Sequence, residues 1–175
     1  NTGKGAPFIN LDIVKGNKIK ITAFPKGGGS ENMSALGMLK PGQGLLGVKK
    51  FVVDTVIAAG AQPCPPIIVG VGIGGGADIA MKVAKKQLLR PIGERHPDKE
   101  LAEIEEELLK AINTTGIGAM GVGGNYTALD VKADYVMRHP ATLPVGVAIQ
   151  CWASRRATAE ISEDGTIKFL THEKK

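Results

Sequence analysis

The 175-residue sequence has few aromatic side chains, few cysteines and no long apolar run. Aromatic residues make up 4% of it, and its two cysteines are too few for a disulfide-stapled scaffold. No apolar stretch reaches the roughly 20 residues that span a bilayer, and no signal peptide is visible. We therefore expect a cytoplasmic protein with no membrane partner. With 43% hydrophobic and 22% charged residues, the composition is that of a globular domain rather than a disordered chain.

Glycine, by contrast, is abundant. The 24 glycines amount to about twice the usual share of roughly 7%. They gather at 27–29, 70–76 and 116–124, without the fixed period that would indicate collagen or a repeat protein. Such loops let the backbone approach a ligand closely, and they serve equally well as tight turns around a crowded core. Composition alone leaves both interpretations open.

Positive charge is concentrated in the first third of the chain. Residues 1–50 contain 8 lysines and 2 acidic residues, a balance of +6, which leaves −1 for the remainder of the total of +5. A basic segment can face nucleic acid, an anionic substrate or an acidic partner. The lysines are spread out, and few aromatic side chains lie between them to stack on bases, so we expect no nucleic-acid partner.

Hydrophobic periodicity predicts a fold of mixed helices and strands. Helical spacing predicts helices over 43–62, 77–90 and 98–113. Alternating or continuous apolar runs predict strands over 8–14, 18–24, 67–71, 127–138, 143–151, 156–162 and 165–171. The first two and the last two strands are expected to form hairpins, whereas 25–32 and 72–76 are expected to be loops. The fold class is therefore α/β, with a mixed, largely antiparallel sheet, packed helices and glycine-rich loops at the active-site edge.

The organisation along the chain is simple. No internal repeat and no linker is evident, so we expect a single domain over residues 1–175. The sequence starts with Asn1 rather than Met. We therefore expect a fragment that lacks an upstream part.

The glycines at 70–76 follow an apolar strand and precede a helix, which is the outline of a dinucleotide-binding fingerprint. Their spacing differs from G-x-G-x-x-G, and no acidic residue ends a second strand about 20 residues later. A Lys-Ser/Thr pair, which completes a phosphate-binding loop, is absent as well. We therefore expect no nucleotide at this turn.

Two cysteines and one histidine are the candidates for chemistry. Cys64 and Cys151 are 87 residues apart, and they could form one disulfide, remain two buried thiols or join a metal site. A buried strand brings Cys151 to its C-terminal end, and Arg155 and Arg156 follow. Fixed cations near a thiol favour the thiolate, which binds metal or attacks as a nucleophile. His139 ends the preceding strand.

Three separated motifs carry a resemblance to a known family. They are Pro25-Lys26-Gly27-Gly28-Gly29-Ser30-Glu31-Asn32, Pro63-Cys64-Pro65-Pro66 with Gly70-Val71-Gly72-Ile73-Gly74-Gly75, and Cys151-Trp152-Ala153 with Arg155-Arg156. Together they resemble the iron–sulfur (class I) fumarate hydratases and the two-subunit tartrate dehydratases. More narrowly, the chain is similar to the α subunit, or N-terminal catalytic region, of that family over almost all of its length.

The resemblance implies a hydro-lyase that adds water to fumarate, or removes it from malate or tartrate. Such enzymes use a [4Fe–4S] cluster held by three cysteines, whose fourth iron acts as a Lewis acid on the dicarboxylate substrate. The site residues implied are the metal ligands Cys64 and Cys151, the substrate-binding Gly27, Gly28 and Gly29, and His139, which is both catalytic and substrate-binding.

The same resemblance implies that parts of the site lie elsewhere. The family's first cluster cysteine lies upstream, and further pocket residues come from a β subunit or C-terminal domain. We therefore expect this chain alone to hold no stable cluster, to be inactive, and to form a homo-oligomer through exposed apolar surface. The alternative is a non-catalytic anion-binding module or assembly scaffold of the same fold.

Two geometric expectations follow from the implied site. Cys64 and Cys151 should lie close together without a disulfide, because ligands of one cluster converge. The loop 25–32, the turn 70–76 and His139 should border the same concavity as the two cysteines.

Overall fold

The computed structural model describes residues 3–172, which fall into two compact units. One unit runs from Phe24 to Arg156, and the other combines residues 3–23 with residues 157–172. The fold is α/β, with helices and two sheets that are largely antiparallel, as the sequence predicts. No linker signal marks the boundaries of the units, and a single domain over residues 1–175 stays a prediction.

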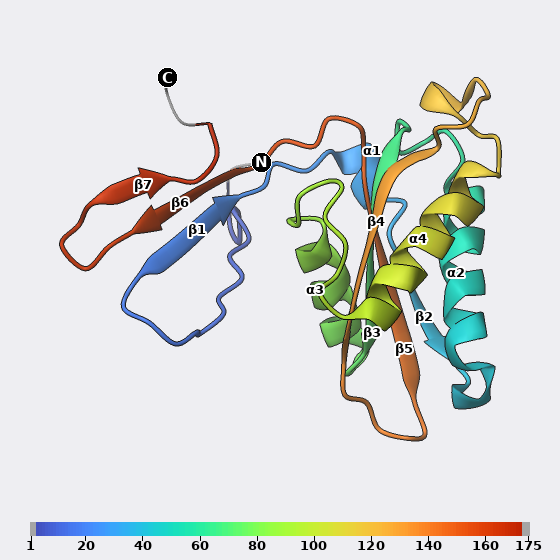
Figure 1. The fold of residues 1–175 in the computed structure, drawn as a ribbon, viewed down its shortest axis with the longest axis horizontal. Coiled ribbons are helices and arrows are strands. Elements are labelled where there is room, and N and C mark those ends of the chain that lie inside the picture. The colour runs from blue at the N-terminus through green and yellow to red at the C-terminus, as the bar shows by residue number, and fades with distance from the viewer. Residues whose placement is uncertain (1–2, 173–175) are drawn as a thin grey trace. The chain divides into compact units, whose positions relative to one another are not determined.

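A four-stranded sheet between two layers of helices forms the larger unit (Figure 1). Its strands, in spatial order, are β2 (Ala35–Leu39), β5 (Leu143–Gln150), β3 (Ile67–Gly74) and β4 (Ala128–Val136). Strand β3 runs parallel to β4 and antiparallel to β5, and β2 is antiparallel to β5. The helices are α2 (Gly44–Ala59), α3 (Ala77–Gln87) and α4 (Lys99–Asn113).

The core lies on both faces of this sheet. Helices α2 and α4 cover one face, where Val52, Leu108 and Val147 belong to one buried apolar cluster. Helix α3 covers the other face, where Ala84 belongs to a smaller buried cluster with Ile68, Leu88 and Ala148. The three predicted helices are confirmed, each shorter than predicted at one end or both. No helix within residues 3–172 is long and apolar enough to cross a membrane.

Glycines in the sheet let α3 approach unusually closely. A Cβ atom on Gly70 would lie 2.1 Å from the Ala84 carbonyl oxygen, and one on Gly72 would lie 2.1 Å from the Ala80 carbonyl oxygen. A Cβ on Gly146, in β5, would lie 2.5 Å from that same Ala80 oxygen. The prediction that residues 72–76 form a turn is wrong for the first three, because β3 continues to residue 74 beneath the helix.

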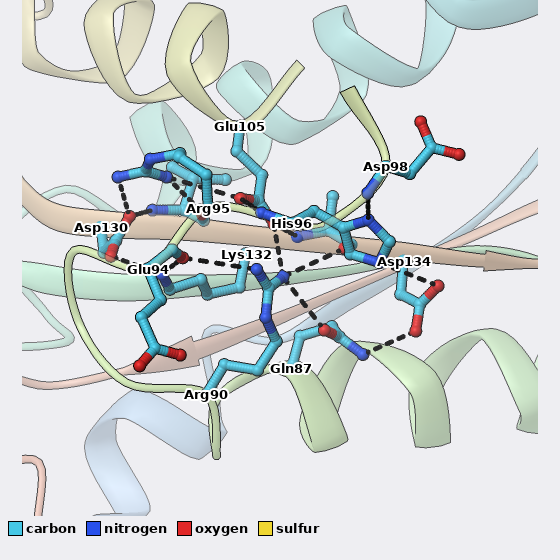
Figure 2. A network of polar contacts seen from close by, with 12 residues as sticks. Gln87, Arg90, Glu94, Arg95, His96, Asp98, Glu105, Asp130, Lys132 and Asp134 are labelled. Atoms are coloured by element: carbon cyan, nitrogen blue, oxygen red, sulfur yellow. Dashed lines mark hydrogen bonds and ion pairs between the residues drawn. The ribbon is translucent and has the colours of Figure 1, made fainter. Parts of the chain in front are cut away.

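The outer edge of β4 bonds to side chains (Figure 2). The Ala133 N–H donates to Glu105 Oε1 over 2.8 Å, and Arg95 Nη1 donates to the Val131 carbonyl oxygen over 3.2 Å. An unpaired strand edge can associate with a strand of another chain. At the outer edge of β4, these side chains bind the backbone groups that such a strand would need.

The charges in this network are buried and paired. The side chains of Glu105, Asp130 and Lys132 are fully buried. Glu105 pairs with Arg90 at 2.5 Å, and Asp130 pairs with Arg95 at 2.7 Å and with Lys132 at 2.8 Å. Burial by itself would raise the pKa of the Asp130 carboxyl, but its hydrogen bonds outweigh burial and hold that pKa below the ordinary value.

The smaller unit is a three-stranded antiparallel sheet of β1 (Ile19–Ala23), β6 (Ala157–Ile161) and β7 (Ile167–Phe169), in that order. The predicted C-terminal hairpin is confirmed as β6 and β7. The predicted N-terminal hairpin is wrong: residues 8–14 form no strand, and β1 pairs with β6 instead. Alternation of apolar residues indicates an extended segment but does not specify its partner.

Four short elements have no counterpart among the predicted ones. They are α1 (Gly28–Glu31), β2, and the 3-10 turns η1 (Pro41–Gln43) and η2 (Ala119–Gly121). Helix α1 falls within the expected loop 25–32. Each is too short to establish a hydrophobic period in the sequence.

Candidate functional site

Cys64 lies in the turn between α2 and β3. Its φ is +56°, in the left-handed region that residues other than glycine seldom adopt. The Cys64 N–H donates to the Ala61 carbonyl oxygen over 3.0 Å, and Pro65 follows. Cys64 is exposed. Backbone conformations of this kind are typical of functional sites, and here the conformation occurs at an accessible thiol.

Cys151 directly follows β5 and lies beside Cys64. The Trp152 N–H donates to the Cys64 carbonyl oxygen over 3.3 Å, which joins segments 87 residues apart. Both cysteines are free; Cys151 is half-buried. The prediction that they lie close together without a disulfide is confirmed. Of the alternatives left open by the sequence, one disulfide and two buried thiols are excluded in this structure.

The three glycines at the start of α1, Gly27–Gly29, lie near Cys151 and the turn that holds Cys64. A Cβ on Gly27 would lie 3.7 Å from Cys151 Sγ, and one on Gly29 would lie 3.4 Å from the Gln62 carbonyl oxygen. The corresponding position on Gly28 has no atom within 4 Å. Gly27 therefore places main chain without a side chain beside the Cys151 thiol, and the space next to Gly28 is empty.

Three charged side chains accompany this loop. Lys26 pairs with Glu31 at 2.8 Å, and Lys85, from α3, pairs with the other Glu31 oxygen at 2.5 Å. Burial lowers the pKa of Lys26, against the opposing effect of Glu31. Burial would raise the pKa of Glu31, but the bonds from both lysines outweigh it and lower that pKa. With all three ionised, the group carries one net positive charge near Cys151.

The sequence did not single out Gln150, the residue before the second thiol. Its side chain is fully buried, and Nε2 lies 3.5 Å from Cys151 Sγ and 3.2 Å from the Ala153 carbonyl oxygen. The sequence pointed instead to the arginines that follow. Arg156 Nη1 donates to two carbonyl oxygens beyond the end of α3. A lone glutamine at the end of a strand carries no sequence signal for contact with sulfur.

The third glycine-rich loop, 116–124, reaches the same end of the sheet. The Met120 N–H donates to the Pro65 carbonyl oxygen over 2.8 Å, which places this loop next to Cys64. A Cβ on Gly121 would lie 2.3 Å from the Ala61 Cβ. Two glycine-rich loops therefore meet the thiol pair, and the second of them was not among the predicted site segments.

His139 lies at the opposite end of the sheet. Gln150 pairs with Ile68 near the start of β3, whereas Gly74 pairs with Val136 at its end, just before the loop that holds His139. At about 3.3 Å per residue, β3 separates the two ends by roughly 20 Å. The prediction of one shared concavity is therefore wrong for His139 and for the turn that ends at residue 76. The part of this prediction that is confirmed is that the loop 25–32 lies next to Cys151.

Comparison with known proteins supplies the family. The model of the fumarate hydratase (Fumerase) family matches residues 1–160. The chain belongs to this family. It is 58% identical over 169 residues to a protein of Methanocaldococcus jannaschii named putative L(+)-tartrate dehydratase subunit alpha. It is also 38% identical over 173 residues to the L(+)-tartrate dehydratase subunit alpha of Escherichia coli K12.

These alignments cover nearly all of this chain but not all of its relatives. They include 95% and 98% of the chain, yet only 59% and 57% of the two relatives. The chain thus spans somewhat more than half the length of these two relatives.

The donor set of the site matches part of what an iron–sulfur cluster needs. Thiolates are the usual protein ligands of such clusters, and two cysteines with free thiols lie side by side here. No three His, Cys, Asp or Glu side chains within residues 3–172 gather as a metal site, and the whole sequence holds two cysteines. The residues present therefore match two of the cysteine ligands that such a cluster needs.

Proposed function

We propose that this chain supplies two of the three thiolate ligands of a [4Fe–4S] hydro-lyase acting on a C4 dicarboxylate. The observation that carries the proposal is the convergence of Cys64 and Cys151, both free, beside the bare backbone of Gly27. The names of the two relatives favour L(+)-tartrate as the substrate, with fumarate and malate as the alternatives from the family.

Each part of the site has a role in this proposal. Cys64 and Cys151 hold the cluster, which when bound supplies a Lewis-acidic iron for the hydroxyl and carboxylate groups of the substrate. The open backbone at Gly28 allows a substrate carboxylate to approach. The net positive charge of Lys26, Glu31 and Lys85 favours a dianion at this end of the sheet.

The third thiolate comes from outside these 175 residues, because the sequence has no other cysteine. A β subunit or C-terminal domain completes the pocket. This chain alone therefore binds no stable cluster and has no hydratase activity. The competing hypothesis of a non-catalytic scaffold makes the same prediction for the isolated chain, so the assembled protein must be tested.

The experiment compares wild type, Cys64→Ser and Cys151→Ser in the complete α subunit assembled with its β subunit. After anaerobic reconstitution, iron and sulfide are counted and activity is measured on L(+)-tartrate, fumarate and malate. We expect four irons and activity in wild type, and loss of both in each variant. Gly42→Ala serves as control, since no atom lies within 4 Å of the added methyl. A fully active serine variant, or an inactive wild type without iron, would overturn the proposal.

His139 requires a second copy of the chain in this proposal. One strand length separates it from the thiols of its own subunit, so it can meet substrate only at the thiols of another. We expect His139→Ala and Cys151→Ser each to be inactive, and a mixed oligomer of the two to regain part of the activity because one of its sites is intact. No recovery in mixed oligomers confirmed by mass would exclude a shared site.

A further inference from the structure

The Gln150 amide is buried in an unusual hydrogen-bonding state. Nothing of it is exposed to solvent, and its Oε1 has no hydrogen-bond partner among residues 3–172. Its Nε2, by contrast, faces two acceptors, Cys151 Sγ at 3.5 Å and the Ala153 carbonyl oxygen at 3.2 Å. Buried polar groups without a partner are rare in native proteins, so one beside a candidate ligand needs an explanation.

The two ends of the amide are not interchangeable. Turning the amide over would place Oε1 against the sulfur and the Ala153 carbonyl oxygen, neither of which donates a hydrogen bond when the sulfur is a thiolate. In the orientation observed, Nε2 has two acceptors and Oε1 has no donor among residues 3–172. The orientation in which nitrogen faces sulfur is therefore the one that makes hydrogen bonds.

Burial of this amide is unfavourable unless its donor bonds are strong. An apolar side chain of similar length would fill the same space without leaving a buried carbonyl oxygen unpartnered. A neutral thiol is a weak acceptor, whereas a thiolate makes a charge-assisted bond roughly twice as strong. The geometry is therefore that of a donor directed at the Cys151 sulfur, and such a bond is strongest when that sulfur is bound to a metal as a thiolate.

We propose that Gln150 is a positioning residue that donates its side-chain N–H to the Cys151 sulfur and fixes that sulfur as a cluster ligand. The inference rests on the proposed function. Partners of this kind orient metal ligands, and hydrogen bonds to cluster sulfurs help to set the reduction potential of the cluster. Gln150 touches neither substrate nor iron, and acts through Cys151.

The test uses the assembled α–β protein carrying Gln150→Met, which keeps side-chain length and removes the donor. Gln87→Met is the matched control, because Gln87 is also a buried glutamine, bonded to Asp134 and Arg90 and not to sulfur. We expect Gln150→Met to shift the midpoint potential of the cluster to more negative values, since loss of a donor destabilises the reduced cluster. We also expect a chelator to remove iron about 10-fold faster, while Gln87→Met matches wild type in both measurements.

A second variant and a metal-free measurement keep the proposal testable. If Gln150→Met does not fold, Gln150→Glu retains the shape but places a carboxylate beside the sulfur, and the negative shift should be larger. In metal-free protein at fixed pH, alkylation of Cys151 relative to Cys64 should fall several-fold in Gln150→Met. An unchanged potential, iron-loss rate and alkylation ratio would overturn the role of Gln150. Absence of a cluster from wild type, with the alkylation ratio still falling, would overturn the proposed function alone.

Discussion

Replacement of Gly72 by alanine tests the close packing of α3 on the sheet. The added methyl carbon would lie 2.1 Å from the Ala80 carbonyl oxygen and 2.6 Å from the Ala84 nitrogen. A carbon and a carbonyl oxygen in favourable contact are about 3.3 Å apart, so the two must separate by more than about 1 Å. Val69 and Val71, in the same strand, are fully buried against α2 and α4 on the other face of the sheet. Strand β3 therefore cannot move away from α3. Helix α3 must therefore move outward.

The outward movement has a cost that can be approximated. It weakens the packing of Ala80, Ala84 and Leu88, all fully buried. Inserting a methyl into a packed core usually costs about 1–3 kcal/mol, and the two close backbone contacts put this site at the upper end. Alanine also lowers the conformational entropy of the unfolded chain relative to glycine, which offsets up to about 1 kcal/mol of this destabilisation. We expect Gly72→Ala to lower the free energy of unfolding by about 2–3 kcal/mol, which corresponds to a drop in Tm of roughly 4–12 °C.

Urea denaturation followed by circular dichroism measures this change. Gly42→Ala is the control, because nothing lies within 4 Å of its added methyl, and its free energy of unfolding should stay within about 0.5 kcal/mol of wild type. If Gly72→Ala were as stable as Gly42→Ala, the helix would not rest on the glycines of the sheet as described.

Two further predictions concern the network at the edge of β4. Glu105→Gln leaves the guanidinium of Arg90 without its buried carboxylate and should destabilise the chain by about 3 kcal/mol in urea denaturation. Glu107→Gln, which removes a largely exposed pair with Lys49, should change stability by less than about 1 kcal/mol; equal effects of the two would contradict the burial of Glu105. The lowered pKa of Asp130 stabilises the fold above the ordinary aspartate pKa, near 4, and this contribution is lost as pH falls through the folded-state value. The urea midpoint of wild type should therefore fall more steeply than that of Asp130→Asn as pH is lowered below about 4, and parallel curves would show that Asp130 contributes nothing.

The long elements of the fold are predictable from the sequence because each carries its own period. Asp98, expected to cap a helix, accepts a bond from the Glu100 N–H over 2.9 Å at the start of α4. The strand partners were not predictable in the same way. Strand β1 pairs with β6, more than 130 residues away, and nothing local in residues 8–24 encodes that pairing.

The candidate site, like the fold, was predictable from the sequence only in part. Family resemblance identified Cys64, Cys151 and the glycine loop, and the structure brings them together at one end of the sheet. The family resemblance also placed His139 in the same pocket, whereas the structure places it at the other end of the sheet. A motif shows which residues occur together in a chain, but not which end of a strand each residue occupies. Gln150 was missed because its significance depends on burial and on an acceptor 3.5 Å away.

The separation of the two thiols along the chain has a consequence for how the protein matures. Cys64 and Cys151 meet through the pairing of β3 with β5, so no short peptide carrying both exists to capture iron during synthesis. In the proposed hydro-lyase, metal loading therefore comes after this sheet has formed, and long-range pairings of this kind form slowly. Under the same proposal, the donor of iron and sulfide must recognise a folded surface, on which the exposed Cys64 is an accessible thiol. A substitution that slows formation of the sheet would consequently appear in the cell as a defect in cluster assembly, even where the finished fold is stable.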